Sequence, residues 1–394
     1  MRLLKKFTWV AGIILLCYTV SMFFIQAEAV MNSKEQKKAP LTAGRTWRIA
    51  YCESGEFSNY ASTLHGLVLG LTELGLLEGA EGLPYVKEQV DTRVMWNWLA
   101  TRRLGSSLEC VGDAYYTFGH MDKAGQKKVK EQIIERLNQG DIDILIVMGT
   151  QGGKELSNNL HHVPTFIFST SNAVQAGIIN SITDSGFDHV WAHMDPTRYQ
   201  RQLEVFHDLF AFKKLGMVYE NSIEGQSFAA VTDVEKVAKE RGFTIVPVFV
   251  KDRQNDKNRY HQEMLEAHQV LAKQGVDAVY STLYFDREVT KLPQLFAPFY
   301  EGKIPVFAQQ GGIEVRNGAL LSVSRADFRG IGYFGAQAIA QSLQGVLPRH
   351  IPQVYENTPN IVLNLEVAEK VGYAPTFDIL LAADEIYQAI ENKK

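Results

Sequence analysis

Hydroxyl and amide side chains stand in this sequence at the points where predicted strands end. Thr150 and Gln151 follow the apolar run 142–147, which is too short for a helix and predicts a strand buried on both faces. The spacing of polar and apolar residues over 154–160 then predicts a helix. In open parallel sheets the ligand crevice lies outside the carboxyl ends of the strands. We therefore expect Thr150 and Gln151 to contact a small molecule.

The same plan recurs later in the chain. Residues 275–282 repeat the order of glycine, acidic residue, apolar strand and hydroxyl-bearing tail found at 140–150. After a helix, each copy leads to a second matching strand, within 161–171 and 302–312 respectively. Two α/β halves with polar residues at their strand ends predict two lobes with a cleft between them.

Candidate ligand contacts are the polar and aromatic residues at these strand ends and helix starts. Hydroxyls, amides and the backbone N–H groups of helix starts suit a carboxylate, Glu220 or Asp286 suits an ammonium group, and tyrosines stack on flat or apolar groups. Each residue could instead cap a helix or fill a core. The candidates are Ser54, Phe57, Ser58, Tyr60, Thr150, Gln151, Ser169 and Thr170 in the first lobe, and Glu220, Gln226, Ser227, Tyr280, Tyr284, Gln309 and Gln310 in the second.

Motifs for catalysis, nucleotide binding or metal binding are incomplete. Residues 149–154 resemble a phosphate-binding loop, but Met148 and Glu155 stand where that motif needs a glycine and a hydroxyl. His189 and His193 have the spacing of zinc ligands on a helix but lack the glutamate of H-E-x-x-H. The sequence has no G-x-S-x-G motif. We expect no enzyme activity, no cofactor and no metal.

The elements that position these residues alternate between strands and helices from residue 46 onward, which favours parallel sheets. Asp195 and Pro196 predict the N-cap and first turn of a helix over 197–210, and the stretch 78–107 predicts one extra helix on the surface or over the cleft. The predicted lobes are 46–188 plus 327–358, and 189–326 plus 359–394. Further helices are predicted over 59–76, 123–139, 227–241, 260–274, 289–300 and 330–343.

The N-terminus has the pattern of a secretory signal peptide. Three basic residues precede an apolar run over 7–25, and Ala27 and Ala29 supply the small residues that a signal peptidase needs. Residues 1–29 are therefore the predicted signal peptide, and 30–45 a flexible leader. The alternative is an uncleaved anchor, because 19 mostly apolar residues just span a bilayer core. In both cases we expect the remaining chain to lie in the periplasm or otherwise outside the cytoplasm.

Charge and cysteine content limit the kinds of partner and the redox states that we expect. Without residues 1–29 the chain keeps 40 − 3 = 37 Lys+Arg and 44 − 1 = 43 Asp+Glu, with no basic block of the kind that binds nucleic acid. Cys52 and Cys110 remain, both in predicted neighbouring strands. They either form a disulfide or stay as two buried free thiols.

Several segments of the chain, taken in order, match one known family. From about Arg48 to the end, the sequence resembles ABC-transporter substrate-binding proteins whose characterised members bind tryptophan and other aromatic amino acids, within the type 1 periplasmic binding proteins. At Ser169–Asn172 and at Gln309–Gln310 it departs from the aspartate–proline and the acidic–hydroxyl pair that the family commonly carries. The matching segments are GLTELGLLEG, VPTFIFSTS, KKLGMVYENSIEGQS, IPVFA, RNGALLSVSRADFRGIGYFGAQAIAQSLQG and NIVLNLEVAEKVGY.

The resemblance implies a monomeric receptor with two Rossmann-like lobes joined by three crossovers. It would close on a small solute, such as an amino acid or related carboxylate, and deliver it to an ABC permease in the membrane. Ligand binding shifts such an open–closed equilibrium by its higher affinity for the closed form. Two other functions stay open: a sensor that presents its bound form to a membrane kinase or chemoreceptor, and an enzyme that uses the same cleft.

Overall fold

The structure, a computed structural model, describes residues 45–102, 104–105, 107–119, 121–251, 256–284, 288–325, 328–356 and 359–392. The chain from Arg45 onward forms one compact unit. The predicted signal peptide, the predicted leader up to residue 44 and the candidate Asp286 lie outside the described residues. Within those residues, no helix combines the length and the apolar character that crossing a membrane requires.

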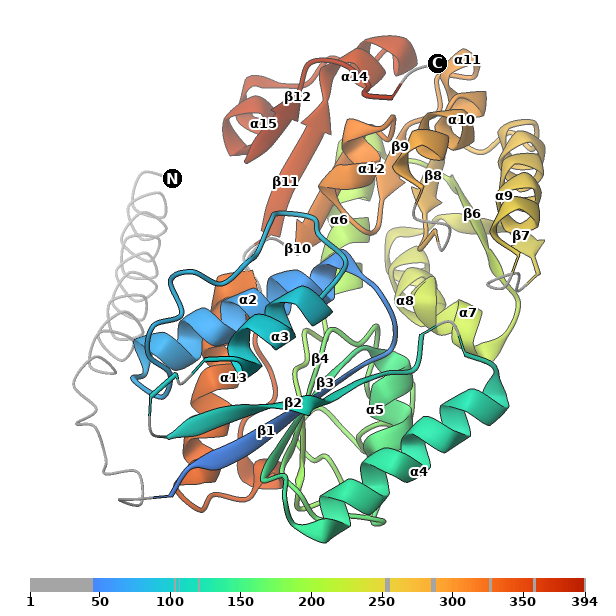
Figure 1. The fold of residues 1–394 in the computed structure, drawn as a ribbon. Coiled ribbons are helices and arrows are strands. Elements are labelled where there is room, and N and C mark those ends of the chain that lie inside the picture. The colour runs from blue at the N-terminus through green and yellow to red at the C-terminus, as the bar shows by residue number, and fades with distance from the viewer. Residues whose placement is uncertain are drawn as a thin grey trace, which may run out of the picture. The chain divides into compact units, whose positions relative to one another are not determined.

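The first lobe is built on a five-stranded parallel sheet. Its strands are β1 (Trp47–Glu53), β2 (Leu108–Thr117), β3 (Ile144–Met148), β4 (Thr165–Phe168) and β5 (Val190–Ala192), in the order β2-β1-β3-β4-β5. Its helices are α2 (Ser58–Glu73), α3 (Arg93–Ala100), α4 (Lys123–Gln139), α5 (Thr150–Leu156) and α13 (Phe328–Leu343). Helices α2, α3 and α13 lie on one face of the sheet and α4 and α5 on the other (Figure 1). All five residues of β3 are buried because both faces of the sheet are covered.

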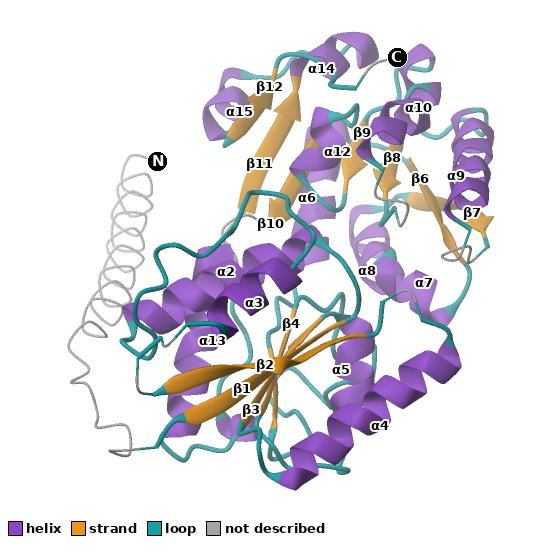
Figure 2. Ribbon diagram, in the orientation of Figure 1, coloured by secondary structure: helices purple, strands orange, loops and turns teal. Residues whose placement is uncertain are grey.

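The second lobe is built on a seven-stranded sheet in the order β12-β11-β10-β9-β8-β6-β7. Its strands are β6 (Lys214–Glu220), β7 (Thr244–Val250), β8 (Ala278–Ser281), β9 (Val306–Ala308), β10 (Leu321–Arg325), β11 (Pro359–Asn364) and β12 (Glu385–Tyr387). Its helices are α6 (Arg198–Phe210), α7 (Ile223–Phe228), α8 (Val231–Arg241), α9 (Lys257–Ala272), α10 (Leu292–Phe296), α11 (Pro298–Glu301), α12 (Gly312–Arg316), α14 (Leu365–Val371) and α15 (Phe377–Ala382). Figure 2 shows the strands of each lobe between helices.

The strand pair β10–β11 is antiparallel, whereas every other pair of neighbouring strands is parallel. After β10 the chain passes to the first lobe, where α13 packs against α2, and then returns as β11. Because β11 enters the sheet from the side of the first lobe, it runs opposite to β10. The prediction of parallel sheets is confirmed at the other pairs of neighbouring strands, and this one pair is antiparallel because of the third crossover.

The first and third crossovers run side by side. Met194 forms a parallel bridge with Val354, and its N–H donates to the carbonyl of Gln353 at 2.8 Å. Strand β5 directly precedes the first crossover and pairs with β4, so residues 190–192 lie in the sheet of the first lobe, whereas the predicted boundary put them in the second lobe. A three-residue strand is too short to give a periodic signal in the sequence.

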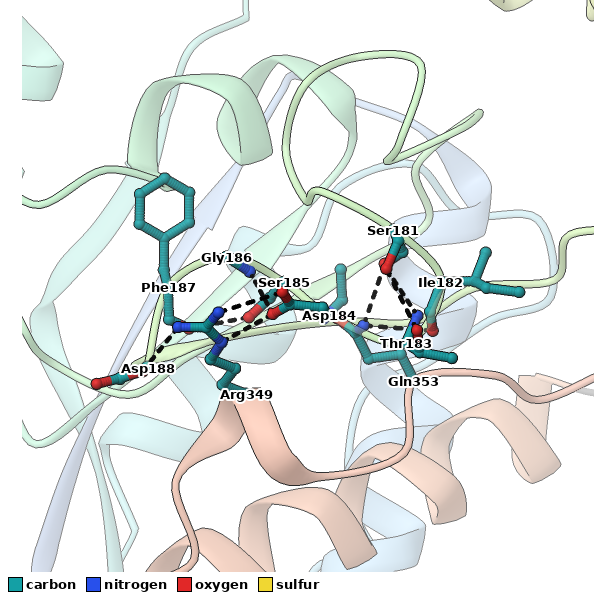
Figure 3. Close-up of polar contacts among 11 residues, drawn as sticks. Ser181, Ile182, Thr183, Asp184, Ser185, Gly186, Phe187, Asp188, Arg349 and Gln353 are labelled. Carbon is teal, nitrogen blue, oxygen red and sulfur yellow. Dashed lines mark hydrogen bonds and ion pairs between the residues drawn. The ribbon is translucent and has the colours of Figure 1, made fainter.

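The segment before the third crossover is fixed to the first lobe by a polar cluster around Arg349 (Figure 3). Its guanidinium binds the carboxylate of Asp184 in a fork, at 2.7 and 3.1 Å, and reaches Asp188 at 3.2 Å. The side-chain amide of Gln353 donates to the carbonyl of Ile182 at 3.4 Å. The segment before the third crossover therefore rests on the loop that leads into β5.

Helix α4 shows how local sequence sets the ends of an element. Its N-cap, Asp122, accepts a hydrogen bond from the N–H of Gly125 at 2.8 Å, and its C-cap, Gly140, has a left-handed φ of 75°. Helix α6 differs from the prediction, because Thr197 is its N-cap. The carboxylate of Asp195, predicted to be that cap, instead accepts hydrogen bonds from Arg201 at 2.9 and 3.0 Å.

Two predicted helices are broken into shorter pieces. The helix expected over 227–241 is α7 followed by α8, which are separated by Ala230 with a left-handed φ of 53°. The helix expected over 289–300 is a 3-10 turn (Val289–Lys291) followed by α10 and α11, and Pro298 starts the second of these helices. The extra helix predicted within 78–107 is α3.

Cys52 and Cys110 are two buried free thiols. They lie on the neighbouring strands β1 and β2, but the partner of Cys110 is Ile49, three residues before Cys52. Three residues of strand span about 10 Å, which exceeds the Cα separation that a disulfide tolerates. The disulfide alternative is therefore wrong, because the strand register separates the two sulfur atoms.

Candidate ligand-binding cleft

A cavity of about 570 Å³ lies between the two lobes, where the carboxyl ends of strands from both sheets meet. The first lobe contributes residues that follow β1, β2, β3 and β4, and the second contributes residues that end or follow β6, β8 and β9. The start of α6, just after the first crossover, completes the wall. This placement agrees with the general rule for ligand sites of open α/β sheets.

The wall from the first lobe is rich in hydroxyl groups held by hydrogen bonds. Ser54 donates from Oγ to the carbonyl of Met148 at 3.0 Å and accepts from the N–H of Gly152 at 2.9 Å. Thr150 Oγ1 accepts from the N–H of Ser171 at 3.2 Å. These contacts fix the ends of β1, β3 and β4 relative to each other, so their polar atoms keep a set spacing.

Gly149 and Ser169 give this wall its unusual backbone. Gly149 has a φ of 93°, and a Cβ atom there would lie 2.0 Å from the hydroxyl oxygen of Tyr60, so only glycine fits. Ser169 has a left-handed φ of 55°, and its Oγ lies 3.0 Å from Oγ1 of Thr63. Strained backbone at a strand end is typical of positions that contact ligands.

The wall from the second lobe rests on a buried amide network. Gln309 donates from Nε2 to the carbonyl of Phe228 at 3.0 Å. Gln202 donates to the carbonyl of Val323 at 2.7 Å and accepts from the hydroxyl of Tyr280 at 2.7 Å. Gln202 and Gln309 are both buried, so their hydrogen bonds lie in a low-dielectric region and hold this wall rigid.

Aromatic and aliphatic side chains supply the apolar part of the cavity. The ring of Phe57 meets the ring of Tyr60 edge-on, with 5.3 Å between centroids. A smaller pocket of the second lobe shares Glu220, Phe228, Tyr260 and Leu283 with the cavity. The cleft therefore offers a hydroxyl-rich wall and an apolar wall to the same ligand.

Burial separates the charged side chains of the cavity into two groups. Arg198 and Glu220 are half-buried, whereas Glu56, Lys123, Glu224 and Lys257 are exposed to solvent. A half-buried charge loses part of its hydration and needs a partner more than an exposed one does. Arg198 and Glu220 are thus the charged groups of this cavity best placed to interact with a ligand.

A buried carboxyl lies directly behind the cavity wall. Glu53, the residue before Ser54, accepts a hydrogen bond from the hydroxyl of Tyr51 at 3.1 Å and another from Thr92. Burial raises the pKa of Glu53 to about 7, while hydrogen bonds from Thr92, Tyr115 and Tyr51 act in the opposite direction. Within the described residues, no group of three His, Cys, Asp or Glu side chains is placed to hold a metal ion.

The structure brings most of the predicted contact residues together. Those that line the cavity are Ser54, Phe57, Tyr60, Thr150, Gln151, Ser169, Thr170, Glu220, Gln309 and Gln310. Five predicted residues do not line it. The backbone carbonyl of Ser58 accepts a hydrogen bond from the hydroxyl of Ser62, and the side-chain amide of Gln226 donates one to Asn221. Ser227 is buried in α7. The hydroxyl of Tyr280 donates to Gln202, and that of Tyr284 forms a hydrogen bond with His261.

Sequence reasoning missed several cavity residues, including four that come from helices. Arg198, Tyr199 and Gln202 come from the start of α6, and Tyr260 comes from α9. The Asp195–Pro196 pair marked the start of α6 in the sequence, and a crossover that leads into the cleft could have pointed to these residues. Tyr260 gave no such signal, because it has the spacing of a core residue on a helix.

The family follows from a match that covers most of this two-lobe fold. A family model described as ABC transporter substrate binding protein matches residues 114–387. The chain belongs to this family. Membership confirms the resemblance seen in the sequence, and the family is one of binding proteins and not of enzymes. No curated protein sequence matches the chain.

Three solved structures share the fold of this chain. Each has a TM-score of 0.61 and covers 87% of this chain and 100% of its own. They are a conserved domain protein from Vibrio cholerae at 19% identity, an ABC domain from Streptococcus pneumoniae in complex with L-Trp at 17%, and the ligand-free, open form of a substrate-binding protein with adhesive properties from Clostridium difficile at 17%. These likenesses confirm the predicted type 1 periplasmic binding protein fold.

Proposed function

We propose that this protein is the extracytoplasmic solute-binding component of an ABC import system, and that it closes its two lobes on a small solute such as an amino acid or related carboxylate. The observation that carries the proposal is the cavity walled by both lobes. A solute between the lobes contacts both of them only when they are close together. Its binding energy therefore favours the closed arrangement.

The chemistry of the cavity walls supports an amphipathic solute. Hydroxyls of Ser54 and Thr150 stand on the first lobe, and Phe228, Tyr260 and Leu283 stand on the second. Hydrogen-bonding groups fix the orientation of a small ligand, and apolar side chains supply most of the contact area. A solute with one polar end and one apolar end satisfies both walls at once.

Family membership supports the proposed partner, an ABC permease. Residues 1–29 are then the signal peptide that sends a monomeric receptor out of the cytoplasm. We keep the division into lobes at 46–188 plus 327–358 and 189–326 plus 359–394, with residues 190–192 moved to the first lobe. The crossovers between these segments would form the hinge.

A thermal-shift panel of amino acids, nucleosides, sugars and small organic acids tests the proposal. A ligand that binds only the native state raises the unfolding midpoint once its concentration exceeds its dissociation constant, by an amount that grows with the logarithm of their ratio. The proposal predicts saturable shifts from one chemical class. A folded protein whose midpoint no class of compound changes, or one that turns over the compound it binds, would contradict it.

A further inference from the structure

The first and third crossovers are hydrogen-bonded to each other along residues 193–197 and 353–356, which we call the crossover pair. The N–H of Met194 donates to the carbonyl of Gln353 at 2.8 Å, and the carbonyl of Met194 accepts from the N–H of Tyr355 at 3.0 Å. Because the two segments hold each other, a rotation of the lobes has to move them together. The backbone then bends at an end of the crossover pair, where a few residues absorb the rotation.

The first-lobe end of the crossover pair is fixed by buried contacts. The indole N–H of Trp191, whose side chain is buried in the first lobe, donates to the carbonyl of Pro352 at 2.8 Å. The side-chain oxygen of Gln353, which is also buried, accepts from the N–H of Ala192 at 3.2 Å. The fork of Arg349 lies beside these contacts (Figure 3). A bend at this end would leave buried polar groups without partners, which costs more than the loss of exposed contacts.

The second-lobe end is held by Arg201 of α6. Its guanidinium donates to both carboxylate oxygens of Asp195, at 2.9 and 3.0 Å, and contacts the hydroxyl of Thr197. The side chain of Asp195 is only 1% exposed, so this interaction is shielded from water and fixes the direction of the guanidinium. On the third crossover, the carboxylate of Glu356 lies 3.8 Å from Arg201 and accepts from Thr197 at 3.2 Å. We call Arg201, Thr197 and Glu356 the hinge clamp.

Burial differs between the two ends of the crossover pair. The side chain of Glu356 is 54% exposed, and interactions of exposed charged side chains are weakened by water. Trp191 and Gln353, at the other end, are buried. A rotation of α6 against the crossover pair breaks the contacts to Glu356 and leaves the buried contacts intact. The second-lobe end is therefore the end at which a bend costs less free energy.

Helix α6 connects the hinge clamp to the cleft. Gln202 lines the cavity, whereas Arg201, the residue before it, contacts the third crossover. The side-chain amide of Gln202 also donates to the carbonyl of Gln309 at 3.3 Å, which ties α6 to the cleft wall of the second lobe. The ion pair of 3.0 Å between Lys154 and Glu224 joins the two lobes. The hinge clamp is thus formed in an arrangement in which the lobes touch.

We propose that the lobes rotate about the second-lobe end of the crossover pair, and that the hinge clamp favours the closed arrangement in the absence of solute. Arg201 is then a positioning residue, which acts on the cleft through α6. This inference rests on the proposed function, since it concerns the motion that closes the cleft. It adds the place at which the hinge bends and the side chains that control the bend.

Distances between two spin labels on the solute-free protein test the hinge clamp. Lys128→Cys on α4 and Gln269→Cys on α9 place one label on each lobe, because both residues are exposed. Cys17→Ser removes a third labelling site, and the two other native cysteines are buried. The distance distribution then gives the ratio of open to closed populations for each variant.

Two substitutions at Glu356 change the hinge clamp by different amounts. Glu356→Lys places a cation opposite Arg201, and we expect the ratio of open to closed populations to rise about 5- to 30-fold. Glu356→Gln removes the attraction without adding repulsion and should raise the ratio about 2- to 5-fold. High salt should reduce the effect of Glu356→Lys, because repulsion between partly exposed charges is screened.

A charge reversal at the first-lobe end is the matched control. The carboxylate of Asp188 is 67% exposed and lies 3.2 Å from the guanidinium of Arg349, so its setting resembles that of Glu356. Asp188→Lys should leave the ratio of open to closed populations unchanged, because the buried contacts at that end remain. Denaturation curves of each variant show whether it is folded.

Three results would overturn the proposal. If Asp188→Lys opens the lobes and Glu356→Lys does not, the hinge bends at the first-lobe end. If both variants open the lobes equally, or if neither changes the populations, the hinge clamp does not set the arrangement of the lobes. Because these measurements contain no solute, each result leaves the receptor function standing, and the thermal-shift panel tests that function separately.

Discussion

Lys154 of α5 and Glu224 of α7 form an ion pair of 3.0 Å that joins the first lobe to the second beside the cleft. The hydrogen bond from Lys154 lowers the pKa of Glu224. Both side chains are largely exposed, so the pair contributes no more than about 1 kcal/mol. A contribution of this size still shifts an equilibrium between two lobe arrangements several-fold.

Lys154→Gln should weaken solute binding about 2- to 5-fold at low salt, because it removes an ion pair that holds the two lobes together around the cleft. The difference from the unmodified protein should disappear at high salt, where exposed charges are screened. Titrations at two ionic strengths measure this. Lys127→Gln, which breaks a pair with Glu131 inside α4, is the matched control. A loss that persists at high salt would show that Lys154 acts in another way.

The loop between α2 and α3 provides a second link between the lobes. Glu88 binds Arg316 at the end of α12 at 2.7 Å, and Lys87 lies 3.4 Å from Glu385 at the start of β12. The base of the loop is held on the first lobe by Tyr85, whose ring stacks on His65 at 4.1 Å. Figure 1 shows this loop extending from α2 toward the second lobe.

Glu88→Gln should raise the radius of gyration of the ligand-free protein in solution scattering, because the lobes lose an ion pair that holds them together. Asp208→Asn removes one carboxylate from a pair with Arg241 inside the second lobe, at 2.6 Å, and should leave the radius unchanged. Identical radii for the two variants would show that the loop does not restrain the lobes.

The buried carboxyl of Glu53 should make stability depend on pH. Its pKa is about 7 in the folded protein and near 4.5 in the unfolded chain, so between these values the folded state binds more protons. The unfolding free energy should therefore fall as the pH rises through this window. Relative to Glu53→Gln, the unmodified protein should lose about 3 kcal/mol between pH 4.5 and 7 and little beyond. Denaturant titrations at several pH values measure the difference, and a constant difference would refute it.

Helices α2 and α13 approach each other at two glycines. A Cβ atom on Gly66 would lie 2.1 Å from the carbonyl oxygen of Phe328, and one on Gly332 would lie 2.0 Å from the backbone of Gly66. Gly66→Ala should thus destabilise the protein by about 1–3 kcal/mol, because backbone atoms must move apart. Gly112→Ala, whose Cβ would be 3.6 Å from that of Ala100, is the control. Chemical denaturation tests both, and equal stability would contradict the close approach.

The pattern of apolar residues predicted the long helices and strands well, because the burial of apolar side chains dominates each of them. The mostly apolar runs 47–52 and 142–147 correspond to β1 and β3, and the predicted helix over 123–139 is α4. Two of the shortest elements carry no such signal. Strands β5 and β12 have three residues each, and their pairing depends on distant parts of the chain that the local sequence does not encode.

The part of the cavity wall that is formed by residues at strand ends could be predicted from the sequence. Thr150, Ser169 and Gln309 line it because parallel strands deliver their carboxyl ends to one edge. Arg198 could not be found in this way, because its place depends on how the first crossover turns into α6. Tyr280 was misplaced because side chains alternate along a strand, and its hydroxyl faces Gln202 in the interior.

Solution scattering with and without saturating solute tests the two-lobe receptor most directly. A compound that raises the unfolding midpoint should also lower the radius of gyration, because the lobes close around it. Closure with bound solute would support the assignment of the cavity as the binding site. A radius that stays the same at saturation would contradict it, because the solute would then bind without bringing the lobes together.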